Sequence, residues 1–397
     1  MRTMTTDVAI IGGGVIGCAI AFYLAKKGIE VVVLEADAVA SEGSGRSFGA
    51  LRSQGRDLNE LPLSIESNKI FPGLNDEFGY DTEYRRNGHF IVVYSEEWVD
   101  NTLKAMYKRQ NDYGYSVSKL FSPEEIYKIV PQFPRELAGA MYCPIDGHCN
   151  PMRLTKGYSL GARKWGAKIL TKAPVKKINV SGGRVVSVDA GDLTVKANKV
   201  LNVTGIHAKE ISKTIGIDLP IACLIYELMV TEPLPHFLDP VAICPERKFG
   251  IRQSANGNIV FGASVPNDLT TDMTVTREKI KERVKLMLSI FPKQLKGVSI
   301  IRSFAGLYDI TPDLLPIMHR FENPRGYYVI AGFSGHGLAI APSVGYQMAE
   351  WIMTGKLHEE YEKFSFSRFE GYDIPSWGTQ KGKYSFHAWP TKQKPSH

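Results

Sequence analysis

The hydrophobic pattern at the start of the chain predicts a strand, a helix and a second strand in close succession. Four consecutive apolar residues, 8–11, lead into a glycine-rich turn at 12–17, and a helix of small and apolar residues follows. A second apolar run, 31–34, ends at Glu35. This order is that of a βαβ unit, whose helix N-terminus offers unpaired N–H groups to an anion.

The spacing Gly12-x-Gly14-x-x-Gly17 favours a dinucleotide at this turn. Gly12 permits the tight turn, Gly14 lets the backbone approach a pyrophosphate, and Gly17 lets the helix pack on the strand. Glu35 follows Gly12 by 23 residues, close to the roughly 20-residue spacing at which a carboxylate meets a ribose hydroxyl. The cofactor contacts predicted in this unit are Gly12, Gly14, Val15, Ile16, Gly17, Glu35 and Ala36.

Two other interpretations of this stretch are not favoured by its composition. Residues 8–25 carry no charge and are long enough to suggest a membrane span, but four of them are glycine and a strand pattern follows directly. Residues 1–7 carry one arginine, one aspartate and no small-residue cleavage site, so a secretory leader is not expected either. We therefore expect no membrane span.

Later periodicities predict further helices and strands. Predicted helices are 58–79, 96–113, 152–165, 208–214 and 276–290. Predicted strands are 84–94, 168–170, 175–179, 184–188, 193–197, 200–203, 221–230 and 249–264. Ser122 followed by Pro123 predicts another helix start, because the pair combines an N-cap with a first-turn proline. Thr204-Gly205 ends the strand 200–203, and we expect this second strand–glycine–helix element to join the first sheet.

A third strand–glycine–helix element, at 327–353, bears on the identity of the cofactor. Its turn runs from Gly332 to Gly337, and Pro342 is predicted in the first helical turn, where proline is tolerated. The N-terminus of this helix favours negative charge, although the first unit already accounts for a pyrophosphate. A reduced flavin carries negative charge over N1 and the C2 oxygen, whereas a nicotinamide does not. FAD is therefore preferred to NAD.

Composition limits the class of protein. A chain of 397 residues exceeds one ordinary core, so two lobes are expected, and 44% apolar with 22% charged residues is typical of a soluble globular protein. Five cysteines without CxxC spacing favour reduced thiols in a cytoplasmic protein. The net charge of +7 is spread along the chain, so no nucleic-acid partner is expected. His148 has no second ligand at metal-binding spacing, so we expect it to be a residue of a turn at 146–151, and no metal site is predicted.

Together these motifs resemble the FAD-dependent D-amino acid oxidase superfamily, which includes glycine oxidase, sarcosine oxidase and dimethylglycine-type enzymes. The resemblance covers residues 5–356 and rests chiefly on Gly306-Leu-Tyr-Asp-Ile-Thr-Pro-Asp313 and Ala331-Gly-Phe-Ser-Gly-His-Gly337. The stretches 88–94 and 146–151 look most like the flavin β-subunits of dye-linked proline, hydroxyproline and opine dehydrogenases. Such subunits work in complexes, so the resemblance implies partner subunits or a homo-oligomer.

The resemblance implies an α/β fold with two lobes. A discontinuous, Rossmann-like FAD-binding domain would comprise residues 1–80, 152–216 and 322–370. An α+β substrate domain with a mixed or antiparallel sheet would comprise residues 81–151 and 217–321. Residues 371–397 would form a C-terminal tail, whose two Trp, two Tyr and one Phe within twenty residues fit packing on its own domain or an interface with another chain.

Further FAD contacts are implied by position. The loop 40–56 is dense in Gly and Ser and carries three arginines, so it suits a ligand better than a core, although an ordinary surface loop is the alternative. The contacts implied outside the βαβ unit are Ser44, Gly45, Arg46, Ser47, Val175, Thr204, Gly205, Gly306, Gly335, His336, Gly337 and Leu338. Gly306 stands where sarcosine oxidases carry the cysteine that bonds to flavin, which implies non-covalent FAD.

Other departures from the family pattern concern the substrate and the electron acceptor. The lysine that sarcosine oxidases use towards oxygen is replaced near Val260, and their carboxylate-binding lysine by Ala339. Glycine oxidase has an arginine where this chain has Tyr308. A fast reaction with oxygen is therefore less expected, and the carboxylate contact must be sought elsewhere.

The function implied is oxidation of the carbon–nitrogen bond of a small amino acid or secondary amine, of the proline, hydroxyproline, opine, sarcosine or glycine type. A neutral amine would transfer its α-hydrogen as hydride to flavin N5, and the imine would hydrolyse, so positioning matters more than a strong base. Two alternatives stay open. One is oxidation of a 2-hydroxy acid or glycerol 3-phosphate, which usually requires a base, and the other is a flavin subunit serving mainly assembly or electron relay.

Five side chains are candidates for the substrate site. Arg52 and Arg252 would bind a carboxylate through the bidentate guanidinium, unless they form interdomain ion pairs. Tyr226 and Tyr308 would supply hydroxyls to a lid or to the substrate, or would pack in the core. His336 is expected to be a structural residue beside the flavin rather than a proton shuttle.

Overall fold

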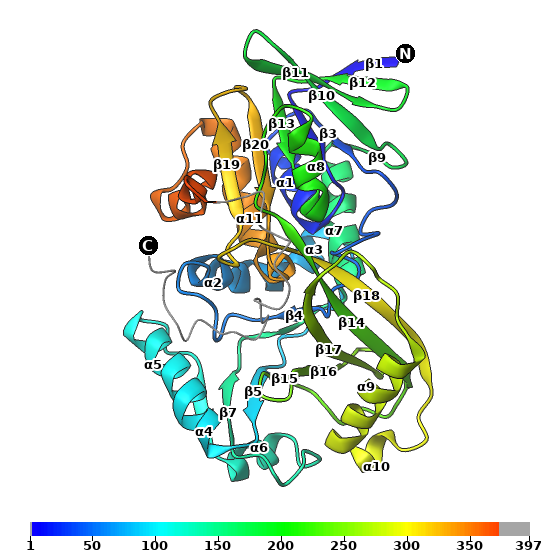
Figure 1. Ribbon diagram of the computed structural model, residues 1–397, viewed down its shortest axis with the longest axis vertical. Helices are drawn as coiled ribbons and strands as arrows, with labels where there is room; N and C mark the ends of the chain where they lie inside the picture. Colours follow the sequence, from blue (N-terminus) through cyan, green and yellow to red (C-terminus); the bar gives the residue numbers. More distant parts are fainter. Residues whose placement is uncertain (1, 373–397) are drawn as a thin grey trace.

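A six-stranded sheet forms the centre of the upper half of the computed structural model, which describes residues 2–372 and, at 264–268, the backbone only (Figure 1). Its order is β19-β20-β13-β2-β3-β9, and all neighbours are parallel except β19 and β20. Its strands are β2 (Val8–Ile11), β3 (Val31–Leu34), β9 (Lys168–Leu170), β13 (Lys199–Asn202), β19 (Ile317–Phe321) and β20 (Tyr327–Ala331). The three strand–glycine–helix elements therefore start from adjacent strands, which confirms that the second one joins the first sheet.

Both faces of this sheet are covered, which explains why its strands are apolar throughout. In β2, Val8 and Ile10 pack against helices, whereas Ala9 and Ile11 pack against a second layer of strands, as the two-residue period of a strand requires. The helices on the first face are α1 (Val15–Lys26), α2 (Leu61–Ile70), α7 (Pro151–Lys164) and α11 (Gly337–Thr354).

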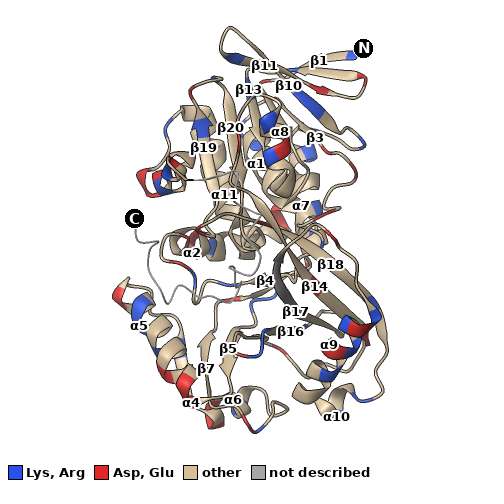
Figure 2. Cartoon of the chain, in the orientation of Figure 1, with Lys and Arg blue, Asp and Glu red and all other residues tan. Residues whose placement is uncertain are grey.

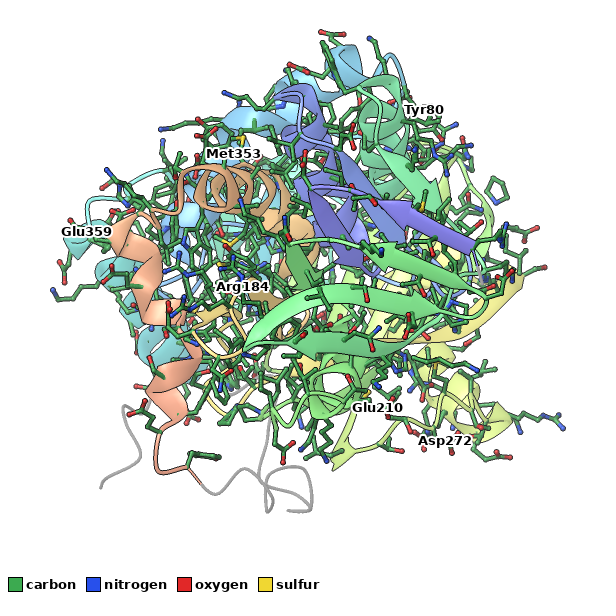
Figure 3. The ribbon with its side chains drawn as sticks, turned by 90° about the horizontal axis from the view of Figure 1, so that it is seen from above. Tyr80, Arg184, Glu210, Asp272, Met353 and Glu359 are labelled. Atoms are coloured by element: carbon green, nitrogen blue, oxygen red, sulfur yellow. The ribbon has the colours of Figure 1, made fainter. Side chains whose placement is uncertain are left out.

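The second layer is a four-stranded sheet in the order β1-β12-β11-β10. Helix α8 packs against the same face of the central sheet. The elements of this layer are β1 (Arg2–Thr5), β10 (Val175–Ser181), β11 (Arg184–Ala190), β12 (Leu193–Lys196) and α8 (Ala208–Lys213). Figure 3 looks down on this sheet, with Arg184 marking the start of β11 and Glu210 lying on α8. The pairing of β1 parallel to β12 was not expected from the sequence.

An eight-stranded sheet forms the lower half, in the order β18-β14-β17-β16-β15-β5-β7-β6 (Figure 1). Its strands are β5 (His89–Val93), β6 (Lys119–Phe121), β7 (Gly139–Cys143), β14 (Ala222–Pro233), β15 (Val241–Cys244), β16 (Phe249–Gln253), β17 (Asn258–Leu269) and β18 (Ile300–Ile310). Only β15 and β5 are parallel neighbours. The predicted mixed sheet is thus confirmed, as is the mixed α/β class.

Helices and a short ladder complete the described part of the chain. The remaining elements are β4 (Ala50–Leu51), η1 (Phe71–Gly73), α3 (Leu74–Phe78), α4 (Glu96–Trp98), η2 (Val99–Leu103), α5 (Lys104–Asp112), α6 (Pro123–Ile129), β8 (Gly147–His148), η3 (Gly205–His207), α9 (Arg277–Ile290), α10 (Pro292–Leu295), η4 (Glu359–Phe364) and η5 (Phe366–Phe369). The predicted start at Ser122 is confirmed, since its hydroxyl and Glu125 form a capping box on α6.

Two local expectations were wrong. Pro342 lies inside α11 rather than in its first turn, because the helix already begins at Gly337. Proline is tolerated there although it cannot donate to the carbonyl one turn back. His148 is not a turn residue but a buried strand residue, since β8 pairs antiparallel with β4 across Ala50.

The distribution of charged residues and the state of the cysteines agree with what the composition predicts. Figure 2 shows basic and acidic residues interspersed along the ribbon in both halves of the molecule. All five cysteines are buried free thiols. Within residues 2–372 no helix has the length and apolarity needed to cross a bilayer. The domain boundaries stay predictions, and the predicted tail lies, from residue 373 onward, outside the described residues.

Candidate active site

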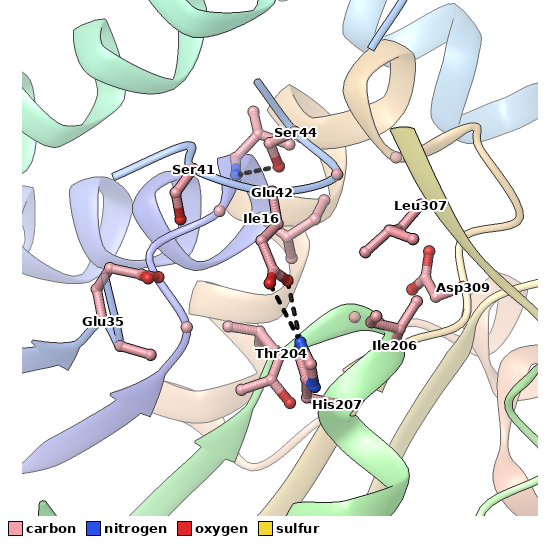
Figure 4. Close-up of a pocket in the computed structure, with 18 of the residues that line it drawn as sticks. Ile16, Glu35, Ser41, Glu42, Ser44, Thr204, Ile206, His207, Leu307 and Asp309 are labelled. Atoms are coloured by element: carbon pink, nitrogen blue, oxygen red, sulfur yellow. Dashed lines mark hydrogen bonds and ion pairs between the residues drawn. The ribbon is translucent and has the colours of Figure 1, made fainter. Parts of the chain in front are cut away.

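A cavity of about 380 Å³ lies at the carboxyl ends of β2, β3 and β13 (Figure 4). Its walls come from the turn after β2, the loop after β3, the turn after β13, strand β18 and the turn before α11. The predicted residues that line it are Gly12, Gly14, Val15, Ile16, Glu35, Ala36, Ser44, Ser47, Val175, Thr204, Gly205, Tyr308, Gly335, Gly337 and Leu338. Crevices at this edge of a parallel sheet are where dinucleotides bind.

The N-terminus of α1 opens directly into this cavity. Gly12 has φ +112°, a value that favours glycine, and a Cβ built on Gly17 would lie 2.1 Å from the Gly12 carbonyl oxygen. The Ser44 hydroxyl, from the loop after β3, accepts the Val15 N–H at 2.9 Å. Close approach of backbone at Gly12 and Gly17 thus sets the turn, and a polar group already lies at the helix start.

Glu35 is held at the far end of the cavity. Its carboxylate accepts N–H groups from Gly13 at 2.7 Å and from Asp37 at 2.8 Å. Val175, at the start of β10, lines the same end. Two predicted cofactor contacts, Glu35 and Val175, therefore come together from distant parts of the chain.

Several predicted cofactor residues lie beside the cavity rather than on its wall. Arg46 braces the loop, because its guanidinium donates to the carbonyls of Ser41 at 3.2 Å and Ala305 at 3.3 Å. A Cβ on Gly45 would lie 2.0 Å from the Ala40 carbonyl oxygen. A Cβ on Gly306 would lie 2.8 Å from the carbonyl oxygen of Arg46, so no side chain fits there without movement.

Asp309, which we did not select from the sequence although it belongs to the 306–313 motif, holds the turn before α11. Its carboxylate accepts the N–H groups of Gly332 at 2.7 Å and Phe333 at 3.2 Å. Burial raises the pKa of Asp309 to about 6, while these backbone hydrogen bonds act in the opposite direction. Asp309 also lines the cavity and therefore fixes the second anion-favouring turn relative to β18.

An ion pair joins two walls of the cavity, as Figure 4 shows. Glu42 Oε2, from the loop after β3, lies 3.1 Å from His207 Nε2, from η3. The hydrogen bond to Glu42 raises the pKa of His207 above its usual 6.5, and the same bond lowers the pKa of Glu42 below 4.5. Both partners are therefore charged between these two pKa values, and the attraction is lost as pH rises through the raised pKa of His207.

Replacing His207 with alanine is expected to speed FAD release from the holoprotein. The pair links the loop at Glu42 to η3 across the cavity, so its loss frees both walls. In the wild type, FAD release should become faster as pH rises through the His207 pKa. In the variant, the rate of FAD release should not change over the same pH range. The measurement is stopped-flow appearance of free flavin fluorescence, and Asp192→Asn, which breaks an exposed pair with Arg2, is the control. Equal rates in all three proteins would contradict the expectation.

On the side of the eight-stranded sheet the cavity is lined by Tyr308, which belongs to an aromatic cluster. The rings of Tyr226 and Tyr308 stack with centroids 5.5 Å apart, and Phe48 packs in the same cluster. Arg252, buried at 5% exposure, donates through Nε to the Phe48 carbonyl oxygen at 2.6 Å. Burial lowers the pKa of Arg252 to about 10, so it stays a cation at neutral pH. The predicted pair of tyrosines therefore meets, and Arg252 supports Phe48.

A second cluster of charge lies between the loop after β4 and the start of α11. Arg56 is buried, and its Nε donates to the Arg52 carbonyl oxygen at 2.9 Å. Its Nη1 has no hydrogen-bond partner among the described residues. Glu60, fully buried, contacts His336 at 2.8 Å. Arg56 and Glu60 were missed, although Arg56 lies in the arginine-rich loop and Glu60 directly precedes a helix.

The arrangement fits a dinucleotide that carries a flavin. The cavity joins Glu35 and Val175 at one end to Gly335, Gly337 and Leu338 at the other. Two helix N-termini, of α1 and α11, open into it, and each favours negative charge. A Cβ on Gly14 would lie 3.0 Å from Ser44 Oγ, so backbone forms the wall where a pyrophosphate would pass. The fold and the cavity define a dinucleotide-dependent protein of the two-lobed flavoenzyme class.

The chain belongs to the FAD-dependent oxidoreductase family (DAO), which it matches over residues 7–351. Mitochondrial dimethylglycine dehydrogenase of Rattus norvegicus is 26% identical over 96% of this chain and 47% of its own length, so the chain spans about half of that relative. The B subunit of opine oxidase from Rhizobium meliloti is 26% identical over 92% of this chain and 98% of that protein. L-proline dehydrogenase from P. horikoshii has a TM-score of 0.87 at 30% identity, covering 94% of this chain and 99% of that one. The resemblance seen in the sequence is thereby confirmed, and FAD is the cofactor of the family.

Acid precipitation of the holoprotein is expected to release FAD into the supernatant. Gly306 carries no nucleophile, and the carbonyl oxygen of Arg46 occupies the space a side chain would need. The measurement is the flavin absorbance of the supernatant and of the redissolved pellet. Flavin that stays with the precipitated protein would contradict a non-covalent site.

Proposed function

We propose that the protein oxidises the carbon–nitrogen bond of a small amino acid or secondary amine with non-covalent FAD. When bound, FAD supplies the two-electron acceptor. The chain's own residues bind the amine, orient its α-carbon and exclude water. The observation that carries the proposal is that Tyr308, which lines the FAD cavity, stacks on Tyr226 and lies close enough to the buried Arg56 for the two side chains to interact electrostatically. The names of the relatives, which include dehydrogenases and oxidases of dimethylglycine, opines and proline, support the same substrate class.

Arginines supply the carboxylate contact in this proposal. Arg56 is 4% exposed and has a guanidinium nitrogen, Nη1, without a partner among the described residues. Arg52 lies next to it and raises the local positive charge, and burial together with Arg56 lowers the pKa of Arg52 well below its usual range. A carboxylate that accepts from such groups gains charge-assisted hydrogen bonds. Arg252, the third arginine predicted from the sequence, donates to the Phe48 carbonyl oxygen and in this proposal holds Phe48 in its aromatic cluster.

Tyr226, Tyr308 and Phe48 form an aromatic wall, which in this proposal borders the substrate. Burial raises the pKa of both hydroxyls, in Tyr308 well above its usual value, so both stay protonated at neutral pH. Their stacked rings offer a flat surface for a small ring or methyl group, and each neutral hydroxyl donates one hydrogen bond and can also accept. This combination suits a compact amine better than a long polar chain.

Anaerobic mixing of the holoprotein with a panel of substrates tests the proposal. Secondary amino acids such as proline and sarcosine, and glycine among primary ones, should bleach the bound flavin. Matched 2-hydroxy acids and glycerol 3-phosphate should leave it oxidised. Bleaching by hydroxy acids alone would favour oxidation of alcohols. No bleaching by any compound, with full flavin content, would favour a subunit for assembly or electron relay.

Partner chains remain part of the proposal, because the relatives named as subunits include the B subunit of opine oxidase and the beta subunit of sarcosine oxidase. Both relatives match most of this chain. In such an assembly a partner subunit would accept the electrons of the reduced flavin, which is expected to react only slowly with oxygen. Co-purification from the native source and mass measurement by light scattering distinguish a heteromeric complex from a homo-oligomer.

A further inference from the structure

Two helix starts meet in a buried carboxylate–imidazole pair. Glu60 precedes α2 and His336 precedes α11, each as the N-cap residue. Glu60 Oε2 lies 2.8 Å from His336 Nδ1. The side chain of Glu60 is fully buried, whereas that of His336 is 22% exposed. The carboxylate is therefore hidden behind the ring, and the ring faces a more open region.

The charges around the ring define its protonation state. Burial raises the pKa of Glu60, but His336, Arg56 and Arg52 outweigh burial, so the pKa is lowered and the carboxylate is ionised. Burial lowers the pKa of His336, and Arg56 lowers it further, against the opposing effect of Glu60. The ring is therefore neutral at neutral pH. From β18, Asp309 faces the backbone of Gly332 and Phe333 rather than the ring.

The hydrogen bond fixes the tautomer of the neutral ring. An ionised carboxylate can only accept, so Nδ1 must carry the hydrogen. Nε2 then bears the lone pair and is the basic atom of the ring. The oxygen Oε1 of Glu60 is buried without a hydrogen-bond partner among the described residues, and the charge of the carboxylate acts on the imidazole as well as on Arg56 and Arg52. A carboxylate behind a histidine stabilises the imidazolium that forms when Nε2 takes a proton.

His336 lies next to the cavity in the chain, between two residues that line it. Its neighbours Gly335 and Gly337 both line the FAD cavity, as does Tyr308 of the aromatic wall. Arg52 and Arg56, the proposed carboxylate contacts, are close enough to act on the His336 charge. A substrate whose carboxylate binds these arginines would bring its amino group into the same region. The pair thus adjoins both the cavity and the two arginines.

We infer that His336 Nε2 is the base that accepts the ammonium proton of the substrate, and that Glu60 is the positioning residue that orients the ring. This inference rests on the proposed function. The substrate N–H bond breaks, its electron pair stays on nitrogen as a lone pair, and the proton forms a new N–H bond at Nε2. The lone pair is what the carbon–nitrogen double bond of the product requires. The imidazolium later returns the proton to water.

Such a base changes the fraction of reactive substrate. An aliphatic ammonium group has a pKa of about 10.4, so roughly one amine in a thousand is neutral near neutral pH. A histidine beside the ammonium group can deprotonate the bound amine at a pH where the free amine stays charged. In this proposal His336 has a direct chemical role, whereas the sequence favoured a structural role beside the flavin.

The pH profile of anaerobic flavin reduction tests the inference in the holoprotein. In wild type the rate should rise with pH and level off below the pKa of the free amine. In His336→Gln the rise should move up to the pKa of the free amine, with a loss of at least tenfold at neutral pH that disappears at high pH. In Glu60→Gln the rise should move to lower pH and reach a lower plateau. His319→Gln, whose ring contacts Ser365 away from the cavity, should match wild type.

A second readout does not depend on turnover. Nitrogen NMR of the imidazoles, assigned through His336→Gln, should show His336 protonated at Nδ1 in wild type and titrating at lower pH in Glu60→Gln. If His336→Gln fails to retain FAD, the kinetic shift in Glu60→Gln and this spectrum carry the test. The inference is overturned if the rate of flavin reduction in His336→Gln is lowered by the same factor at every pH. It is also overturned if the neutral ring of His336 carries its hydrogen on Nε2. An unreduced wild-type flavin with the expected NMR spectrum instead overturns the proposed function alone.

Discussion

Replacing Gly17 with alanine is expected to abolish FAD binding and to destabilise the upper half of the protein. A Cβ at this position would lie 2.1 Å from the Gly12 carbonyl oxygen and 2.8 Å from Val203 Cγ2. The first contact is with backbone, so α1 must shift away from β2 and from the wall of the cavity. Overpacking of this kind costs about 3 kcal/mol. Flavin content after gel filtration and urea unfolding measure the two effects.

Gly73→Ala is the matched control for this change. A Cβ on Gly73 meets nothing within 4 Å, and its backbone lies in the right-handed helical region. This variant should keep its full flavin content and unfold at the wild-type urea concentration or slightly above it. A Gly17→Ala protein that binds FAD with unchanged stability would show that the helix start does not set the cofactor site.

Arg56→Ala and Arg52→Ala are each expected to slow flavin reduction by carboxylate-bearing amines at least about tenfold, with FAD still bound. A charged hydrogen bond is worth about 1.5–3 kcal/mol, which corresponds to roughly tenfold or more in binding. Proline and pyrrolidine form a useful pair, since only proline carries the carboxylate. The loss should appear with proline and be small with pyrrolidine, in saturation curves of anaerobic reduction.

Two further variants sharpen this comparison. Arg302→Ala removes an exposed guanidinium that lies over Phe304, 4.8 Å from the ring centroid, and should leave both amines unaffected. Arg252→Ala removes the donor to the Phe48 carbonyl oxygen and should affect both amines, because Phe48 belongs to the aromatic wall. Unchanged saturation with proline in Arg52→Ala and Arg56→Ala would place the carboxylate elsewhere.

The fold was largely predictable wherever local pattern and tertiary structure agree. The βαβ unit at residues 8–35 was correctly predicted because buried parallel strands are uniformly apolar and the glycines fix the turn. The pairing of β1 with β12 was not predictable, since Arg2–Thr5 is a short, exposed stretch whose partner lies far along the chain. The start of α11 at Gly337 was missed because Pro342 usually marks a first turn, and here the tertiary packing of α11 overrides that preference.

The candidate site likewise contains residues that could be predicted from the sequence and residues that could not. Glycines and Glu35 could be predicted because their spacing itself carries the chemistry. Glu42 and His207 could not, since their contact depends on how the loop after β3 faces η3. Glu60 was missed because an acid before a helix is usually a solvated cap residue, and only the packing of α2 against α11 brings it to His336. The role of Asp309 depends likewise on a turn that lies next to it only in the folded chain.

The most direct test of carbon–nitrogen oxidation is anaerobic single turnover with the fastest-reducing amine, compared with the same amine deuterated at its α-carbon. We expect the unlabelled amine to bleach the bound flavin fully and to give one equivalent of imine-derived product per flavin. We expect the deuterated amine to bleach it more slowly, because the α-carbon–hydrogen bond is broken in the step observed. Bleaching without an imine-derived product, or no bleaching by any amine in a protein with full FAD content, would contradict the account.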